Sequence, residues 1–281
     1  MSWQMRIEHS TGYRYASPVV SSYNEARIIP QTGGGQLTLE ATVATEPVTT
    51  LYRYWDYWGS QVTAFEVLDP HDEMTISATA TVHTQPIPVT ATKLSWEELR
   101  TDDFGDQFVE FLEVSDRVAP PEDLAEMFDE IAAHCPDPDR AARSICSLIH
   151  DEVDYVVGST VVSGHAADSW AARAGVCQDM THLAIGGLRR IGIPARYVSG
   201  YLHPVSNPVV GESVRGESHA WVEWWDGDWR GFDITNDTAP DERHIVVAIG
   251  RDYGDVPPLS GIFTGGGMSS MFVDVQVTRL A

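Results

Sequence analysis

Hydrophobic and polar residues alternate over much of residues 1–90, and this two-residue period predicts β-strands. The clearest stretches are rich in β-branched residues and cover residues 36–43, 61–67 and 74–83. Turn-forming residues such as Gly33-Gly34-Gly35 separate them. Strands that each bury one face pack against one another, so we expect an antiparallel, β-sandwich-like domain over residues 1–90.

The period changes after residues 85–88 (QPIP), which indicates a linker. Leu124, Phe128 and Ile131 recur at helical spacing, and a second helix follows Pro138. A third helix is expected to begin at Cys177 and to end before Gly192 and Pro194. Strands are then expected over residues 195–203, 218–225, 229–234, 244–249 and 271–278, with a loop over 250–267. Residues 91–281 are therefore expected to contain helices followed by strands.

Composition narrows the set of partners. Lys and Arg number 18 and Asp and Glu number 41, so the formal net charge is −23. Such a field repels nucleic-acid phosphates and anionic lipid, and no apolar run reaches the length of a membrane span, so we expect neither partner. The chain has three cysteines, an odd number that cannot all pair in disulfides within one chain, and no Cys-x-x-Cys motif. With no apolar leader after Met1, they favour a reducing, cytoplasmic setting.

Cys177 is the candidate nucleophile. It follows Gly175-Val176 and opens the third predicted helix. Free backbone N–H groups and the positive end of the helix dipole stabilise a thiolate at such a position. An isolated cysteine is more often an inert, buried residue, so this prediction needs a base and an acid nearby.

His219 and Asp233 can supply them, because both lie in a predicted hairpin. A three-residue loop Trp225-Asp226-Gly227 pairs Trp224 with Asp228 and places Asp233 directly opposite His219. A two-residue loop, Asp226-Gly227, places Asp233 on the other face. The residues alone allow both loops, and a Cys-His-Asp triad requires the first.

Three segments carry a family resemblance: residues 175–183 (GVCQDMTHL) with 192–201 (GIPARYVSGY), residues 218–222 (SHAWV), and residues 231–236 (GFDITN). They resemble the nucleophile, histidine and acid segments of bacterial transglutaminase-like proteins, and residues 250–258 (GRDYGDVPP) resemble the end of that core. The region before the core resembles the extra N-terminal β domain of the bacterial group. Ile234 stands where the family pattern has proline.

The resemblance implies a papain-like α+β core in which Cys177 attacks an amide carbonyl of a peptide or protein substrate and forms a thioester. His219 then moves the proton and Asp233 orients His219. The backbone N–H of Cys177 is one expected oxyanion donor. The second is not readable from the sequence, and Trp170 and Gln178 are weak candidates. Asp179 and His182 either support the site or lie on the helix surface. Arg251 and Tyr253 either line the cleft or belong to a structural loop network.

Other functions stay open at this point. A zinc site is disfavoured because no His or Cys pair has ligand spacing, so we expect no metal and no cofactor. A non-catalytic binding or scaffold module with the same fold is the second alternative. Between the two fates of a thioester, we favour hydrolysis of a peptide or isopeptide-type amide over transfer to an amine, which would cross-link proteins.

Overall fold

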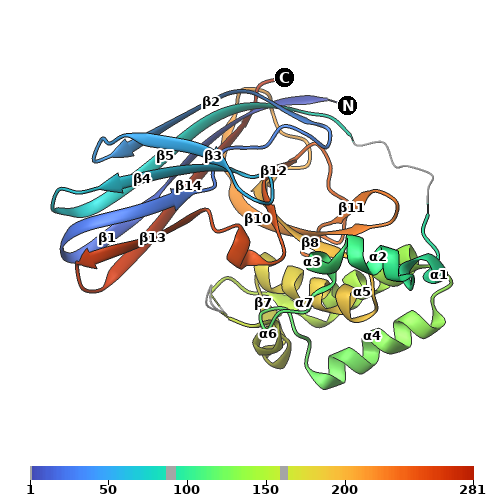
Figure 1. The fold of residues 1–281 in the computed structure, drawn as a ribbon. Helices are drawn as coiled ribbons and strands as arrows, with labels where there is room; N and C mark the ends of the chain where they lie inside the picture. Colours follow the sequence, from blue (N-terminus) through green and yellow to red (C-terminus); the bar gives the residue numbers. More distant parts are fainter. Residues whose placement is uncertain (1, 87–92, 159–163) are drawn as a thin grey trace.

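The computed structural model describes residues 2–86, 93–158 and 164–281, apart from the side chain of Glu217. A long antiparallel sheet forms one part of the molecule, and a mixed helical and β core forms the other (Figure 1). In the described part of the chain, no helix is both long and apolar enough to span a bilayer.

The large sheet is organised around one strand, β1 (Trp3–Ala26). The first half of β1 pairs with β5 (His71–Thr84) on one side and with β14 (Ser269–Arg279) on the other. Its second half pairs with β4 (Gln61–Val67) and β13 (Leu259–Gly265). The sheet is completed by β2 (Gln36–Glu46) on β5, β3 (Leu51–Trp55) on β4, and β9 (Ser213–Arg215) on β14.

Side chains of β4 and β5 meet in one core although these strands pair with different halves of β1. Phe65 and Val67 of β4 pack with Met74 and Ile76 of β5 in a buried cluster. This packing is the sandwich-like arrangement that the alternating pattern predicts, because each strand turns its apolar face inward.

The expected boundary near residue 90 falls among residues 87–92, which lie outside the described residues together with part of the predicted linker. The large sheet does not follow that division of the chain. Strands β9, β13 and β14 come from beyond it and pair in the same sheet as β1. β13 lies where a loop was expected, because only Leu259 of its seven residues is buried and no alternation marks it. Pairing with β1, which is distant in sequence, makes this segment a strand.

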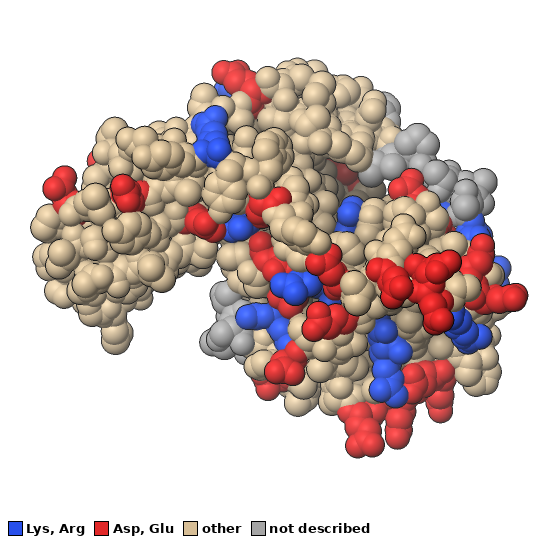
Figure 2. Space-filling model, viewed as in Figure 1, with Lys and Arg blue, Asp and Glu red and all other residues tan. Residues whose placement is uncertain are grey.

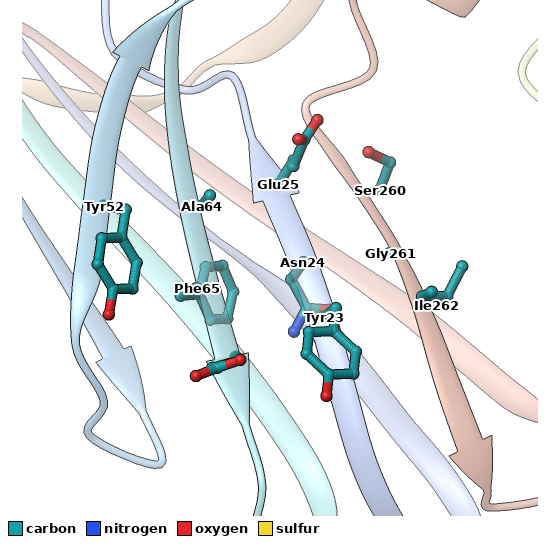
Figure 3. Close-up of a pocket in the computed structure, with 10 residues that line it drawn as sticks. Tyr23, Asn24, Glu25, Tyr52, Ala64, Phe65, Ser260, Gly261 and Ile262 are labelled. Carbon is teal, nitrogen blue, oxygen red and sulfur yellow. The ribbon is translucent and has the colours of Figure 1, made fainter.

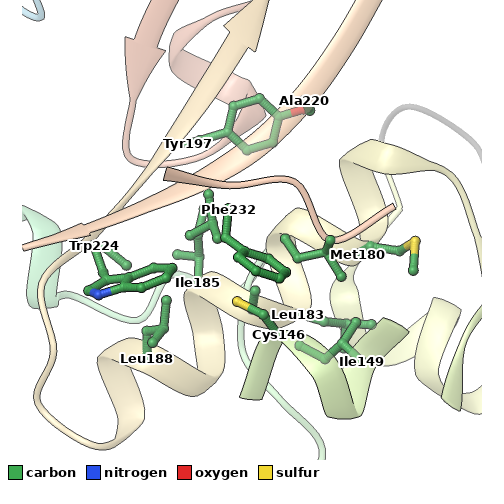
Figure 4. Packing of buried hydrophobic residues seen from close by; sticks show 14 of the residues in the cluster. Cys146, Ile149, Met180, Leu183, Ile185, Leu188, Tyr197, Ala220, Trp224 and Phe232 are labelled. Carbon is green, nitrogen blue, oxygen red and sulfur yellow. The ribbon is translucent and has the colours of Figure 1, made fainter. Parts of the chain in front are cut away.

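The core domain contains a four-stranded antiparallel sheet in the order β11-β10-β8-β12. Its strands are β8 (Ala195–Leu202), β10 (Glu217–Trp225), β11 (Trp229–Phe232) and β12 (His244–Gly250). Helix α7 (Cys177–Arg190) packs against β8 and β10. Figure 4 shows Leu188 of α7 beneath Trp224 of β10, and Leu183 of α7 beside Cys146 and Ile149 of α5 (Pro138–Glu152).

The remaining elements are short or lie outside α7. They are α1 (Trp96–Leu99), α2 (Asp102–Gln107), α3 (Val109–Leu112), α4 (Glu122–His134), α6 (Ala166–Ala172), the parallel pair β6 (Asp154–Tyr155) and β7 (Ala174–Gly175), and a 3-10 turn at Tyr253–Asp255. Helix α7 and strands β8 and β12 begin at the residues predicted from the sequence.

Candidate active site

Cys177 is the first residue of helix α7, as predicted. The buried carboxylate of Asp179 accepts a hydrogen bond from the backbone N–H of Val176 at 2.8 Å, which fixes the chain as it enters the helix. A side chain at Gly175 would come within 2.8 Å of the Asp179 Cβ, so glycine is needed there for this packing. The arrangement leaves the half-buried Cys177 thiol at the positive end of a 14-residue helix.

The hairpin after β10 differs in detail from the prediction. Trp225 pairs with Trp229 and Trp224 with Arg230, so the loop is Asp226-Gly227-Asp228. Loop length and strand parity are as expected, and Gly227 has the left-handed φ of 80°. The register, however, is shifted by two residues, so Asp233 is not directly opposite His219. Because the shift is even, both side chains stay on the same face of the sheet.

His219 and Asp233 are in direct contact. His219 Nε2 lies 2.8 Å from Asp233 Oδ2, and both side chains are buried. The His219 side chain also interacts with the Cys177 side chain, which lines the same cleft, and Nδ1 is the ring nitrogen that Asp233 leaves for it. Burial opposes the charged form of His219, but its bonds to Asp233 and Cys177 outweigh this and raise the pKa of His219 to about 10. The imidazole therefore holds a proton at neutral pH.

Asp233 follows the end of β11 and is held from several directions. Its Oδ2 accepts hydrogen bonds from His219, from His244 Nε2 at 3.0 Å and from Asn236 Nδ2 at 2.7 Å. Its Oδ1 accepts from the Asn236 backbone N–H at 3.2 Å. Burial works against ionisation, but these hydrogen bonds prevail and hold the pKa of Asp233 well below its usual range. Asp233 is therefore an ionised acceptor for two histidines.

His244, at the start of β12, was not among the residues predicted from the sequence. Its only sequence signal is a histidine at the first position of a predicted strand, and nothing local indicates that this position faces Asp233. The long-range pairing of β12 with β8 brings it there.

In the described part of the chain, His219, Asp233 and His244 are also the one group that could hold a metal ion, with ligand atoms within 4.8 Å of one another. Those atoms already hydrogen-bond one another, so a cation would replace existing bonds.

Asp179 and His182 are both buried, so neither lies on the helix surface. His182 Nε2 accepts a hydrogen bond from the backbone N–H of Tyr253 at 3.1 Å. Burial lowers the pKa of His182 to about 3, so this ring is neutral. His182 thus ties α7 to the turn that carries Tyr253, whose side chain lines the cleft beside Cys177.

Two of the weaker candidates lie elsewhere. Trp170 donates its indole N–H to Asp123 at 2.9 Å and does not line the cleft. Arg251 forms an ion pair with Asp255 at 2.9 Å, which is the structural loop network that was the alternative interpretation. Gln178 does line the cleft next to Cys177.

The cleft that contains Cys177 and His219 has a volume of about 710 Å³. Its walls come from two parts of the molecule. One wall is formed by α7, β8 and β10, and the other by residues of the large sheet such as Val273 and Val275 of β14.

A second cavity of about 720 Å³ lies on the large sheet, between Tyr52 of β3 and Ile262 of β13 (Figure 3). Its lining contains no cysteine or histidine, so it holds no pair of the kind that Cys177 and His219 form.

The other two cysteines have different surroundings. All three thiols are free. Cys146 is fully buried in the core, and burial raises the pKa of its thiol well above the usual range. Cys135 is half-buried, with Sγ 3.8 Å from Ser144 Oγ. Neither lies beside a histidine that is paired with a carboxylate, as Cys177 does.

Comparison with known proteins gives two family matches. Residues 5–83 match the bacterial transglutaminase-like N-terminal region, and residues 125–234 match the transglutaminase-like superfamily core. An uncharacterised protein of Mycobacterium leprae is 41% identical over 99% of this chain and all of its own length. An uncharacterised protein of Mycobacterium tuberculosis is 34% identical over 97% of this chain and 91% of its own.

Two further relatives are named for an activity. A candidate cysteine protease from Cytophaga hutchinsonii has a solved structure that covers all of this chain, with a TM-score of 0.78 and 23% identity over 92% of its own length. That likeness concerns the fold. A protein-glutamine gamma-glutamyltransferase of Pseudomonas aeruginosa is 29% identical over 37% of this chain and 17% of its own length.

Proposed function

Because this chain belongs to the transglutaminase-like superfamily, we propose that it is a cysteine-dependent amide hydrolase with Cys177, His219 and Asp233 as its catalytic triad. The observation that carries the proposal is the unbroken series of contacts from Cys177 to His219 and from His219 to Asp233. A nucleophile, a base and an orienting acid in hydrogen-bond contact are the elements of covalent acyl transfer.

The first half-reaction forms the thioester. The Cys177 thiolate attacks the carbonyl carbon of a peptide or isopeptide-type amide, and a tetrahedral oxyanion forms. The C–N bond then breaks, and the protonated His219 gives its proton to the departing amine. The raised pKa of His219 supports this role, because the ring carries the proton that the amine needs. Asp233 holds His219 Nε2 and leaves the other nitrogen for Cys177 and the substrate.

The second half-reaction releases the acyl group. Water attacks the thioester, neutral His219 takes a proton from it, and the C–S bond breaks to return the Cys177 thiolate. In both steps the backbone N–H of Cys177, at the start of α7, is the expected donor to the oxyanion. Of the two side chains considered as a second oxyanion donor, Trp170 and Gln178, Gln178 lines the cleft.

Transfer to an amine is the second candidate, since a primary amine can take the place of water at the same thioester. The sequence similarity to the gamma-glutamyltransferase of Pseudomonas aeruginosa favours it. The two outcomes differ only in the second half-reaction, so one experiment can measure the partition.

The test uses a library of peptide amides with the intact protein, analysed by mass spectrometry. The expected result is an acyl adduct on Cys177 that hydroxylamine removes, followed by a carboxylic acid product. A fluorescent primary amine added in millimolar amounts measures the share that goes to transfer. The Cys177→Ser variant should lose the adduct and the product. An adduct on Cys135 or Cys146, or turnover that survives Cys177→Ser, would reject the proposal.

A further inference from the structure

The large sheet supplies an apolar wall to the cleft that holds Cys177. Met271, Val273 and Val275 of β14 all line the cleft, at every second position of the strand. Their exposure rises along the strand, from 3% at Val275 to 39% at Val273 and 49% at Met271. The strip therefore begins in the buried contact beside the core and emerges into the open part of the cleft.

The strip has the length of a short peptide. Strand residues rise about 3.3 Å each, so Val275 and Met271 are separated by about 13 Å, the span of about four residues of an extended chain. Thr11 of β1 pairs with Val273 and also lines the cleft. Tyr155 and the largely exposed Val157 also line the cleft. A cleft of about 710 Å³ with such walls is larger than one small amide needs.

The charge of the cleft differs from that of the whole chain. The formal net charge is −23, and on the face seen in Figure 2 acidic side chains gather over the helical part, while the sheet shows few. Among the described residues, no aspartate or glutamate lines the cleft. Arg215 lines it, but Arg215 pairs with Gln276, whose side chain is on the face of β14 opposite to Val275. The strip itself is therefore uncharged.

We infer that the segment of substrate next to the scissile amide is an uncharged, apolar peptide that lies along the β14 strip in extended form. This inference rests on the proposed function, because it places the reacting carbonyl at Cys177. It gives the N-terminal sheet a role in substrate selection, with Val273 and Met271 as the residues that determine specificity. A carboxylate that lies against Val273 and Met271 would lose part of its hydration to a strip that carries no charged side chain, and is therefore disfavoured on the strip.

The test measures how fast Cys177 displaces iodide from iodoacetamide, N-butyl iodoacetamide, N-hexyl iodoacetamide and the analogue of the hexyl probe that ends in a carboxylate. Each rate is divided by the rate with free cysteine. Burying one methylene fully is worth about a fourfold gain, so a half-exposed wall should give about twofold per methylene. The hexyl probe should therefore react at least tenfold faster than iodoacetamide, and the carboxylate should remove most of that gain.

The variants test whether the strip is responsible. Val273→Asp should lower the ratio of hexyl to unsubstituted rates by about fivefold or more. Met271→Gln, at a more exposed position, should lower it less and serves as a second variant if Val273→Asp does not fold. The matched control is Val48→Asp, because Val48 is 91% exposed and outside the cleft. Its ratio should equal that of the unaltered protein.

Two failures can be told apart. The inference is overturned if the hexyl probe reacts with the unaltered protein no faster than iodoacetamide, or if the carboxylate probe is as fast as the hexyl probe. In either case Cys177 still reacts with iodoacetamide, so the proposed function stands. If Cys177 reacts no faster than Cys135 with any probe, the proposed function itself fails.

Discussion

His244 Nε2 lies 3.0 Å from Oδ2 of Asp233, the same oxygen that accepts a hydrogen bond from His219. Asp233 lies beyond the end of β11, where its backbone forms an isolated bridge with Thr238, whereas His244 is the first residue of β12. On its other side, His244 Nδ1 lies 3.0 Å from the backbone nitrogen of Asp241. His244 therefore holds Asp233 from β12, the strand at the opposite edge of the sheet from β11, and we expect it to act as a positioning residue.

His244→Ala should lower kcat by about 10- to 100-fold and leave KM within about twofold, because a hydrogen bond to a charged group is lost while the cleft is unchanged. His244→Gln carries an N–H at a similar reach and should recover part of the loss. The measurement is steady-state kinetics on one peptide amide across pH. His203→Ala is the control, because His203 is equally buried but does not contact Asp233. Equal effects on kcat in the two alanine variants would mean that His244 acts through stability alone.

Asp233→Asn should keep the fold and cut turnover by about 10²- to 10⁴-fold, because an amide oriented toward His219 stabilises the wrong imidazole tautomer. Circular dichroism and amide hydrolysis measure the two effects. Asp228→Asn in the hairpin loop is a suitable control. Asp226→Asn is not a suitable control, although Asp226 was expected to lie in an exposed turn. Asp226 is buried, and its carboxylate binds Arg230 at 2.7 Å and the Leu94 backbone N–H at 2.8 Å. Asp226→Asn is therefore expected to lower stability.

Iodoacetamide should label Cys177 at pH 6 at least about tenfold faster than Cys135 or Cys146. The reason is the positive charge beside the Cys177 sulfur, which comes from the protonated His219 and from the partial positive charge at the start of α7. Cys146 is fully buried, and burial outweighs the charge of Arg143 and raises the pKa of its thiol. Peptide mapping by mass spectrometry of the native protein measures the three rates. Similar rates at all three thiols would contradict the prediction.

The order of the elements followed from local patterns, whereas the contact of His219 with Asp233 was predicted only because a Cys-His-Asp triad requires the three-residue loop. Helical spacing located α7, and strand parity placed His219 and Asp233 on one face whichever of two even registers formed. Parity depends only on the loop length, and the left-handed Gly227 fits a loop of two or of three residues, so the sequence alone left that length open. The register itself depends on cross-strand packing, for example of Trp225 against Trp229, and no local signal describes that packing.

Long-range pairing accounts for what was missed. β13 and His244 have little local signal, since their positions depend on partners far away in the sequence, namely β1 for the strand and β8 for His244. The same holds for the cleft wall, because β14 reaches the site only by pairing with β1 at the other end of the chain. A pattern with period two predicts that β14 is a strand, but it does not say which sheet the strand joins.

EDTA should leave folding and amide hydrolysis unchanged within about twofold. The triad needs no ion, and the atoms of His219, Asp233 and His244 that could bind one are already hydrogen-bonded to one another. Added Zn²⁺ should inhibit, because a cation at these three atoms would take the His219 nitrogen that Asp233 now holds. Activity and metal content are measured on the same sample after dialysis. Loss of activity with EDTA that Zn²⁺ restores would show that a metal is required.

The contribution of His219 to stability should depend on pH in a defined direction. Its pKa in the folded protein is about 10, above the ordinary value of 6.5, so folding favours its protonated form. The stabilisation is therefore fully present below about pH 6.5 and is lost as the pH rises through about 10. His219→Gln removes the titrating group, so the difference in unfolding free energy between the unaltered protein and this variant should shrink steadily from pH 6 to pH 10.5. Urea denaturation at a series of pH values measures it. A difference that stays constant, or grows, over this range would mean that His219 is not held as an imidazolium by Asp233 and Cys177.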